Sequence, residues 1–319
     1  GFDYDFPVIH ERDRKGLILA KEEGVDFIAL SFVRDGNDLD ELRKEMEKIN
    51  LSAKIVAKIE TQKALVNIDE IIEKSDVIMI ARGDLGVEIP AEEVPFYQKL
   101  IIKKCLEKGV PVITATQMLE SMINKPLPTR AEVSDVANAI YDNTDSVMLS
   151  GETASGKYPL EAVKTMHSVI SFSEEKNRVS DIRNLYNYDV SKNYQMICDS
   201  AFNLYKVLKA NNENVKGFIV FTQSGSTARM ISRYRPHVPI FAFCPTESVS
   251  QSLTVGYGLL PITQKSLKEK TEIVKEDITN SLKYLEENKL IQKKELFIII
   301  HGDYWKSSVG TSTIRIATS

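Results

Sequence analysis

The sequence predicts an α/β protein with a parallel sheet in its first half and a smaller α/β region after it. Three observations lead to this prediction. Five short apolar runs recur between residues 25 and 152. The segments between them carry apolar residues at helical spacing, which makes a strand–helix alternation. After about residue 175 the chain turns polar and charged before a second set of apolar runs begins.

The five apolar runs predict parallel strands joined by right-handed crossovers. They are VDFIALSF (25–32), AKIVAKIE (53–60), SDVIMIARGD (75–84), VPVITATQ (110–117) and DSVMLSGE (145–152). Nearly continuous apolar runs are typical of strands that are buried on both faces. Helical spacing predicts helices over 37–49 and 93–109, and Gly24 and Gly109 directly follow helical segments, as C-terminal caps often do.

The second region has its own helix and strands. Residues 194–211 predict a helix, and residues 216–223, 238–243, 295–303 and 311–317 predict strands. The polar stretch between the two regions is typical of a helix end followed by a linker. We therefore expect a first domain over residues 1–175 and a smaller α/β domain over residues 176–319.

Composition narrows the classes of function. The net charge of −4 gives no reason to expect nucleic acid or a membrane surface as a partner, and no apolar run reaches the roughly 18 residues of a membrane span. The three cysteines, Cys105, Cys198 and Cys244, are far apart and form no CxxC pair. This pattern indicates buried, reduced thiols and a cytoplasmic location.

Four of the five runs end in polar residues spaced two apart. These pairs are Lys58 and Glu60, Arg82 and Asp84, Thr114 and Thr116, and Ser150 and Glu152. Residues i and i+2 of a strand point to the same face, and the carboxyl ends of parallel strands form the ligand site. One such pair can simply be a strand end that meets water. Four in succession predict a functional cluster.

The residue types of this cluster suit phosphoryl transfer. Glu60 and Asp84 are hard oxygen donors on successive strands, which suits Mg²⁺ or Mn²⁺ together with substrate and water oxygens. Lys58 is a compact cation that can neutralise a phosphoryl group in transfer. For Arg82 two interpretations stay open, contact with substrate and a salt bridge that fixes the turn, and we favour the salt bridge.

Two loops resemble phosphate-binding loops. Residues 151–158, GETASGKY, have the spacing of a P-loop, but Tyr158 stands where a metal-binding hydroxyl is needed and Glu152 would repel phosphate. The second loop leads from a strand into a helix, which favours an anion site over a simple helix cap. Its residues are Thr222, Gln223, Ser224, Gly225, Ser226 and Thr227.

With these residues in place, the chain resembles the pyruvate kinase family. The resemblance rests on FIALSFVR, AKIETQKALVNIDEI, IARGDLGVEIP, ITATQMLESMINKPLPTRAEVSDVANAIYD and VMLSGETASGKYPLEAV, which follow one another in that family's order. It implies a (β/α)8 TIM barrel, of which this chain holds about five of the eight strands, and a C-terminal α/β domain of regulatory type.

The resemblance also implies the reaction and its residues. The expected activity is the glycolytic transfer of a phosphoryl group from phosphoenolpyruvate to ADP, giving pyruvate and ATP. Lys58 would stabilise the phosphoryl group, Thr116 would contact the substrate near its enolate carbon, and Glu60 and Asp84 would bind Mg²⁺ or Mn²⁺. The turn of Ala81, Arg82, Gly83 and Asp84 would bind the substrate carboxylate.

Further expectations concern regulation and assembly. The loop 222–227 would bind the phosphate of a sugar-phosphate activator, with the segment Trp305–Thr311 closing over it, although Gln223 is a poor charge partner for a phosphate. The family resemblance also implies an allosteric homo-oligomer, a tetramer, and a K⁺ requirement. Ser150 and Glu152 would line the same mouth as the catalytic residues.

The chain departs from the family at its start. Family members carry a longer N-terminal part, which supplies the first three barrel strands, a phosphate-binding arginine, the K⁺ ligands and a lid domain. Three explanations stay open: a fragment, assembly with another chain or with a copy of itself, and a shortened paralogue. The alternative functions are a catalytically silent sugar-phosphate-binding protein and a metal-dependent enolpyruvate lyase or aldolase.

Overall fold

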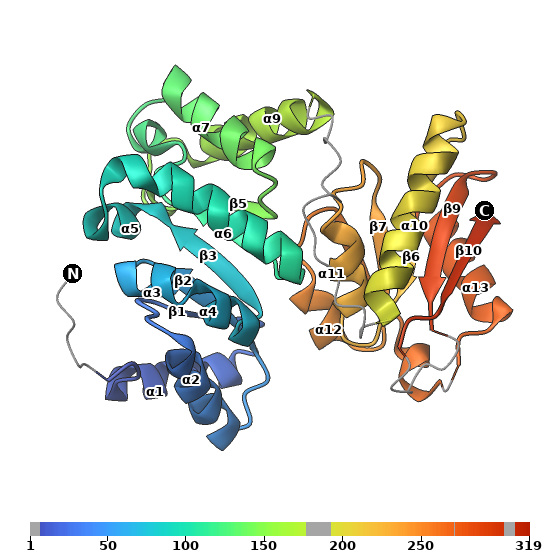
Figure 1. Cartoon of the computed structure of the whole chain (residues 1–319), viewed down its shortest axis with the longest axis horizontal. Helices are drawn as coiled ribbons and strands as arrows, with labels where there is room; N and C mark the ends of the chain where they lie inside the picture. The colour runs from blue at the N-terminus through green and yellow to red at the C-terminus, as the bar shows by residue number, and fades with distance from the viewer. Residues whose placement is uncertain (1–6, 177–192, 271, 303–309) are drawn as a thin grey trace. The chain divides into compact units, whose positions relative to one another are not determined.

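The computed structural model describes residues 7–176, 193–270, 272–302 and 310–319 (Figure 1). The chain divides into two compact units, residues 1–180 and 181–319, which are described separately below. The predicted domain boundary at residue 175 stays a proposal, because most of the segment around it lies outside the described residues.

Unit 1 contains a five-stranded parallel sheet in the order β1-β2-β3-β4-β5. Its strands are β1 (Phe27–Leu30), β2 (Lys54–Ile59), β3 (Val77–Ala81), β4 (Val112–Ala115) and β5 (Ser146–Met148). Each strand falls within one of the five predicted apolar runs, so these predictions are confirmed. Every strand pairs with the next one along the chain, which is the arrangement of consecutive strands in a (β/α)8 barrel.

Helices connect the strands of unit 1. They are α1 (Glu11–Glu22), α2 (Gly36–Lys48), α3 (Gln62–Val66), α4 (Ile68–Lys74), α5 (Arg82–Glu88), α6 (Val94–Lys108), α7 (Arg130–Tyr141), α8 (Gly151–Ala154) and α9 (Pro159–Lys176), with 3₁₀ turns at Ala91–Glu93 and Glu120–Ile123. The predicted cap at Gly109 is confirmed, because this residue ends α6 with a φ of 68°. Gly24 has a φ of 64° just after α1.

The register of the sheet brings the strand ends to one edge. Ile59 pairs with Ile80, and Ala81 pairs with Ala115. Ala115 in turn pairs with Met148. The residues that directly follow β2, β3, β4 and β5 therefore lie along the same carboxyl edge.

The side of unit 1 next to β1 is open. A cavity of about 690 Å³ lies between α1 and β1, and its apolar lining includes Leu17, Ile28 and Leu30. Its polar lining includes Ser31, which follows β1 at the carboxyl edge. The two outer strands, β1 and β5, are largely only half-buried, whereas the three strands between them are mostly buried.

Unit 2 contains a mixed sheet in the order β10-β9-β6-β7-β8. Only β10 runs antiparallel. The strands are β6 (Val215–Phe221), β7 (Ile240–Cys244), β8 (Leu259–Thr263), β9 (Leu296–His301) and β10 (Thr313–Thr318), and the helices are α10 (Asn193–Ala210), α11 (Ser226–Ser232), α12 (Glu247–Ser252) and α13 (Lys275–Glu287), with a 3₁₀ turn at Lys265–Glu269. The predicted helix and four strands of this region are confirmed.

One strand of unit 2 was not predicted. β8 contains Pro261, which breaks the apolar pattern and cannot donate a ladder hydrogen bond. The sheet tolerates this proline because β8 lies at its edge.

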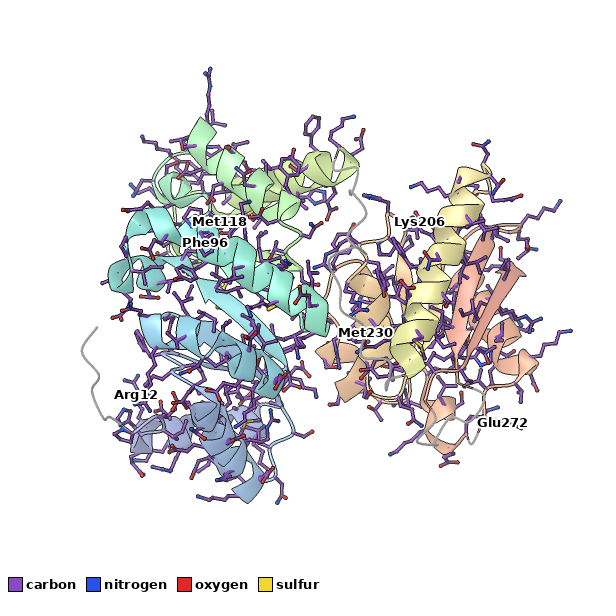
Figure 2. All side chains as sticks on the ribbon, in the orientation of Figure 1. Arg12, Phe96, Met118, Lys206, Met230 and Glu272 are labelled. Atoms are coloured by element: carbon purple, nitrogen blue, oxygen red, sulfur yellow. The ribbon has the colours of Figure 1, made fainter. Side chains whose placement is uncertain are left out.

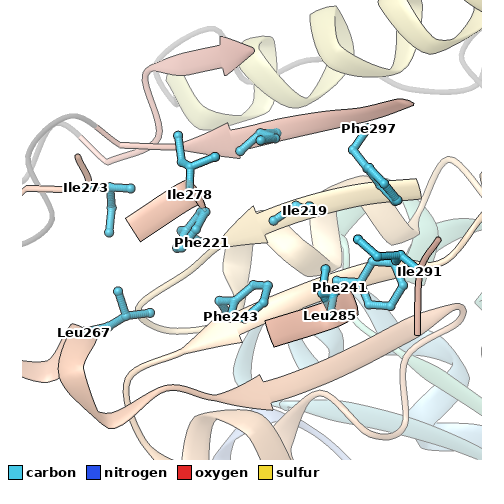
Figure 3. Packing of buried hydrophobic residues seen from close by; sticks show 11 residues of the cluster. Ile219, Phe221, Phe241, Phe243, Leu267, Ile273, Ile278, Leu285, Ile291 and Phe297 are labelled. Atoms are coloured by element: carbon cyan, nitrogen blue, oxygen red, sulfur yellow. The ribbon is translucent and has the colours of Figure 1, made fainter. Parts of the chain in front are cut away.

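A well-packed apolar core stabilises unit 2. Phenylalanine and isoleucine side chains from β6, β7 and β9 meet Ile278 and Leu285 of α13, as Figure 3 shows. Phe221 and Phe243 stack with ring centroids 5.5 Å apart, a favoured arrangement for aromatic pairs. No helix in the described parts of the chain is both long and apolar enough to cross a membrane.

Candidate active site

Lys58 and Glu60 form the centre of the carboxyl edge of unit 1. Lys58 Nζ lies 2.6 Å from Glu60 Oε1 and donates a hydrogen bond of 2.8 Å to Ser31 Oγ. Glu60 is 1% exposed, and its Oε2 accepts a 2.6 Å hydrogen bond from the Phe32 N–H. The predicted pair therefore meets, and the end of β1 orients both of its members.

One oxygen of Glu60 is suited to a cation. Oε1 is buried and makes no hydrogen bond with the described residues, because the nearby Lys58 ammonium is an ion-pair partner outside hydrogen-bond geometry. Asp84 is exposed on the neighbouring turn. The described residues contain no group of three or more His, Cys, Asp and Glu side chains that could hold a metal. A divalent ion here would therefore need ligands beyond these two carboxylates.

Arg82 and Asp84 do not share a face, so that expectation was wrong. β3 ends at Ala81 and α5 begins at Arg82, and residues two apart on a helix point about 200° apart. Arg82 is buried and forms a two-pronged salt bridge with Asp135 of α7, with both N–O distances at 2.7 Å. The salt bridge that we favoured for Arg82 is present, and its partner is Asp135.

Thr116 lies against this turn. Its Oγ1 accepts a 2.8 Å hydrogen bond from the Gly83 N–H, and its carbonyl oxygen accepts one of 2.8 Å from Arg82 Nη2. A Cβ added to Gly83 would lie 3.3 Å from Thr116 Oγ1. Glycine thus allows this close approach, which any other residue would crowd. Ala81, the first residue of the turn, is buried at the end of β3.

Thr114 and Glu152 are structural, contrary to the expectation that they face a ligand. Thr114 is buried in β4 and donates to Thr144. Glu152 is 2% exposed, and its two oxygens accept the N–H groups of Leu119 and Ser150. The chain enters α8 at Gly151, so a strand spacing no longer applies to Ser150 and Glu152.

Sequence reasoning missed two members of the site. Ser31 lies at the end of the first apolar run, directly after β1, so the strand-end rule that selected Lys58 and Glu60 could also have selected it. Asp135 lies within a helix far along the chain, and no local pattern marks it as the partner of Arg82.

The predicted phosphate loop of unit 2 joins β6 to α11. Thr222 Oγ1 accepts the Gly225 N–H at 3.0 Å, and Gly225 has a φ of 84°. The hydroxyls of Ser224 and Ser226 lie 2.9 Å apart, and Gln223 is exposed. The sheet order changes direction at β6, and such a switch point is where ligands bind in open α/β sheets.

Part of the expected cover of this loop lies outside the described residues. Residues 305–309 of the predicted segment Trp305–Thr311 are not described. Thr311 is described and buried, and its hydroxyl lies 2.6 Å from that of Thr227.

Family models match both units. The model described as pyruvate kinase, barrel domain, matches residues 1–163, and the model described as pyruvate kinase, alpha/beta domain, matches residues 197–317. The chain is 45% identical to a pyruvate kinase of Bacillus licheniformis over 95% of its own length and 50% of the relative. It is 48% identical to a pyruvate kinase of Geobacillus stearothermophilus, over 81% of this chain and 44% of the relative.

A solved structure is similar as well. It is a crystal structure of a pyruvate kinase from Cryptosporidium parvum, with a TM-score of 0.85 and 36% sequence identity, matched over 98% of this chain and 63% of that one. The chain spans about half the length of the curated relatives it matches. The fold is thus a partial barrel followed by the C-terminal α/β domain.

Proposed function

Because the chain belongs to the pyruvate kinase family, we propose that unit 1 binds phosphoenolpyruvate and transfers its phosphoryl group to ADP, giving pyruvate and ATP. One observation carries this proposal. An ammonium, Lys58, is held against the buried carboxylate of Glu60 at the carboxyl edge of the parallel sheet. The family match favours phosphoryl transfer over lyase or aldolase chemistry.

Each residue of the edge has a role in this proposal. Lys58 neutralises charge on the phosphoryl group during transfer. The bond between phosphorus and the enol oxygen breaks, and a bond between phosphorus and a terminal phosphate oxygen of ADP forms. Ser31 and Glu60 hold the ammonium in place. Thr116 contacts the resulting enolate near the carbon that gains a proton.

Glu60 and Asp84 would hold Mg²⁺ or Mn²⁺. The buried Glu60 oxygen without a hydrogen bond, the exposed Asp84 carboxylate and their all-oxygen chemistry fit such an ion. The ion would supply positive charge to the substrate oxygens when bound. The family also supports a K⁺ requirement, for which we assign no ligand in this chain.

The turn 81–84 would bind the substrate carboxylate through backbone N–H groups. The Gly83 N–H now donates to Thr116 Oγ1. A carboxylate that takes this N–H would therefore compete with the threonine hydroxyl for it.

Family membership also suggests how the chain is regulated and how it assembles. We propose that the loop 222–227 binds the phosphate of a sugar-phosphate activator, supported by its hydroxyl groups and by its place at the switch point of the sheet. We also propose a cytoplasmic homo-oligomer, a tetramer, as the working form.

A coupled assay tests the reaction. The chain is mixed with phosphoenolpyruvate, ADP, Mg²⁺ and K⁺, and pyruvate formation is followed through lactate dehydrogenase. We expect turnover that Lys58→Ala abolishes while Mn²⁺ binding, measured by electron paramagnetic resonance, persists. Lys104→Ala is the matched control, because Lys104 is 27% exposed, close to the 24% of Lys58, and pairs with Asp69 on the surface. Absence of turnover in the unaltered chain would contradict the proposal for this chain.

A further inference from the structure

Thr116 and Gln117 have an unusual backbone. Their φ angles are 68° and 56°, so two successive residues that are not glycine lie in the left-handed region. For a β-branched residue such as threonine this conformation is a genuine outlier, because its side chain crowds the backbone. Such residues persist only where the surrounding structure fixes them, and they cluster at functional sites.

The chain is fixed on both sides of this strained pair. Before it, β4 is paired with β3 and β5. After it, Met118 and Leu119 are fully buried; Met118 is labelled in Figure 2. The Leu119 N–H donates to the buried Glu152 carboxylate at 3.1 Å.

Arg82 binds the strained residue itself. Its Nη2 donates 2.8 Å to the Thr116 carbonyl oxygen and also lies 2.7 Å from Met118 Sδ. The next residue, Gly83, donates its N–H to Thr116 Oγ1 at 2.8 Å. The first turn of α5 therefore holds both the backbone and the side chain of Thr116.

Asp135 holds Arg82 in turn. Both guanidinium prongs donate to its carboxylate at 2.7 Å, and Nη1 also donates to Gln98 Oε1 at 3.3 Å. Arg82 is 9% exposed, so its charge needs this partner. A two-pronged pair fixes the plane of the guanidinium, which a lysine cannot reproduce.

The geometry points to Arg82 and Asp135 as positioning residues for Thr116, an inference that rests on the proposed function and deepens it. The clamp, Arg82 with Asp135, keeps Thr116 left-handed. In this conformation the Thr116 hydroxyl donates to the Ala115 carbonyl at 2.7 Å and accepts from Gly83. One lone pair of its oxygen then stays available to a ligand at the carboxyl edge.

The first test measures the conformation of Thr116 without reference to activity. Threonine labelled with ¹³C at Cα and Cβ is incorporated, and the Thr116 resonance is assigned by its loss in Thr116→Ser. The test variant, Arg82→Met/Asp135→Leu, removes the clamp without leaving a buried charge unpaired. We expect the Thr116 shifts to leave their left-handed values or to broaden.

A matched control removes another partly buried arginine–aspartate pair from the same unit. In Arg34→Met/Asp38→Leu the lost pair has an Nη2–Oδ1 distance of 2.9 Å and Asp38 is 4% exposed. We expect this control to leave the Thr116 shifts unchanged. Arg82→Lys, which keeps the charge but loses the fork, replaces the double variant if that variant does not fold. A folded clamp variant whose Thr116 shifts match those of the unaltered chain overturns the inference.

The second test uses turnover. We expect the clamp variants to lower kcat by about 10²-fold, the order expected for a small misplacement of a catalytic group, with the KM for phosphoenolpyruvate close to its original value. An equal rise in KM with unchanged kcat would instead indicate lost ground-state binding and count against positioning. If the unaltered chain shows no turnover, the proposed function fails for this chain, and the threonine shifts still decide whether the clamp holds Thr116.

Discussion

The two sheets of this chain organise their sites in different ways. In unit 1 the strands follow one another in chain order, so several consecutive strand ends contribute side chains to one edge. In unit 2 the order changes direction at β6, so one loop at the switch point is the candidate site. Both units have a packed apolar core, and unit 1 also has a cavity beside β1. The proposed catalytic site, spread over several strand ends, and the proposed binding site in one loop thus accompany two kinds of sheet topology.

The largest expected effect separates the two sites. Glu60→Gln removes the charge of a proposed metal ligand but keeps its shape. We expect turnover to fall by at least about 10³-fold, because a weakly held metal ion no longer neutralises the negative charge of the transition state. Mn²⁺ binding, followed by electron paramagnetic resonance, should weaken with it. Calorimetric binding of a sugar phosphate to unit 2 should stay unchanged.

A matched change in unit 2 completes this comparison. Ser224→Ala/Ser226→Ala removes the paired hydroxyls of the loop. It should abolish sugar-phosphate binding and leave turnover without activator intact. Loss of basal turnover in this variant would break the distinction between the two sites.

The strands of both units could be predicted from sequence because buried parallel strands are continuous apolar runs. β8 could not, because Pro261 interrupts its run at an edge position. The prediction that Arg82 and Asp84 point to the same face was wrong for a different reason. A helix begins directly after β3, and the sequence of this turn does not mark the change from strand to helix.

The site itself could be predicted only in part. Lys58 and Glu60 follow from strand-end spacing, since Lys58 lies near the end of β2 and Glu60 directly follows this strand. The Arg82–Asp135 pair joins residues on two helices. The packing of α7, rather than any local sequence pattern, brings Asp135 to Arg82. The barrel came from family resemblance, because five strands in order do not by themselves define closure.

A smaller effect is expected in the core of unit 2. Phe297 is fully buried in the aromatic cluster, and Phe297→Ala should destabilise unit 2 by about 3–5 kcal/mol, the usual cost of such a cavity. Urea unfolding followed by circular dichroism should show this loss. Leu260→Ala on the edge strand β8 is the control, because Leu260 is 44% exposed. Equal losses in the two variants would mean that the core does not dominate the stability of unit 2.

A smaller effect is expected at the start of α7 in unit 1. Glu132 accepts hydrogen bonds from Ser121 and Thr129 and completes a capping box. Burial raises the pKa of Glu132, but these hydrogen bonds outweigh burial and leave the pKa below its ordinary value. Glu132→Gln should therefore cost about 1 kcal/mol at neutral pH, because hydrogen bonds to a charged carboxylate are stronger than those to a neutral amide.

The pH dependence gives this prediction its sign. A carboxyl whose pKa is lowered by folding stabilises the fold above its unfolded pKa, and this contribution is lost as the pH falls through the folded pKa. The difference between the unaltered chain and Glu132→Gln should thus be full at neutral pH and disappear in acid. Unfolding midpoints across this pH range measure it, and a difference that grows in acid would contradict the assignment.

The smallest expected effect concerns the thiols, which report on both units at once. All three cysteines are free and buried. Burial raises the pKa of Cys198 to about 12 and that of Cys244 to about 11, and it raises the pKa of Cys105 well above its ordinary value. Because the thiolate is the nucleophile, iodoacetamide at pH 8 should label none of them in the native chain.

Mass spectrometry after labelling in rising urea then compares the units directly. We expect Cys105 of unit 1 to react at lower urea than Cys198 and Cys244, since a cavity lies beside β1 in unit 1. Simultaneous labelling of all three thiols would show that the two units unfold together and that this difference in packing does not set their stability.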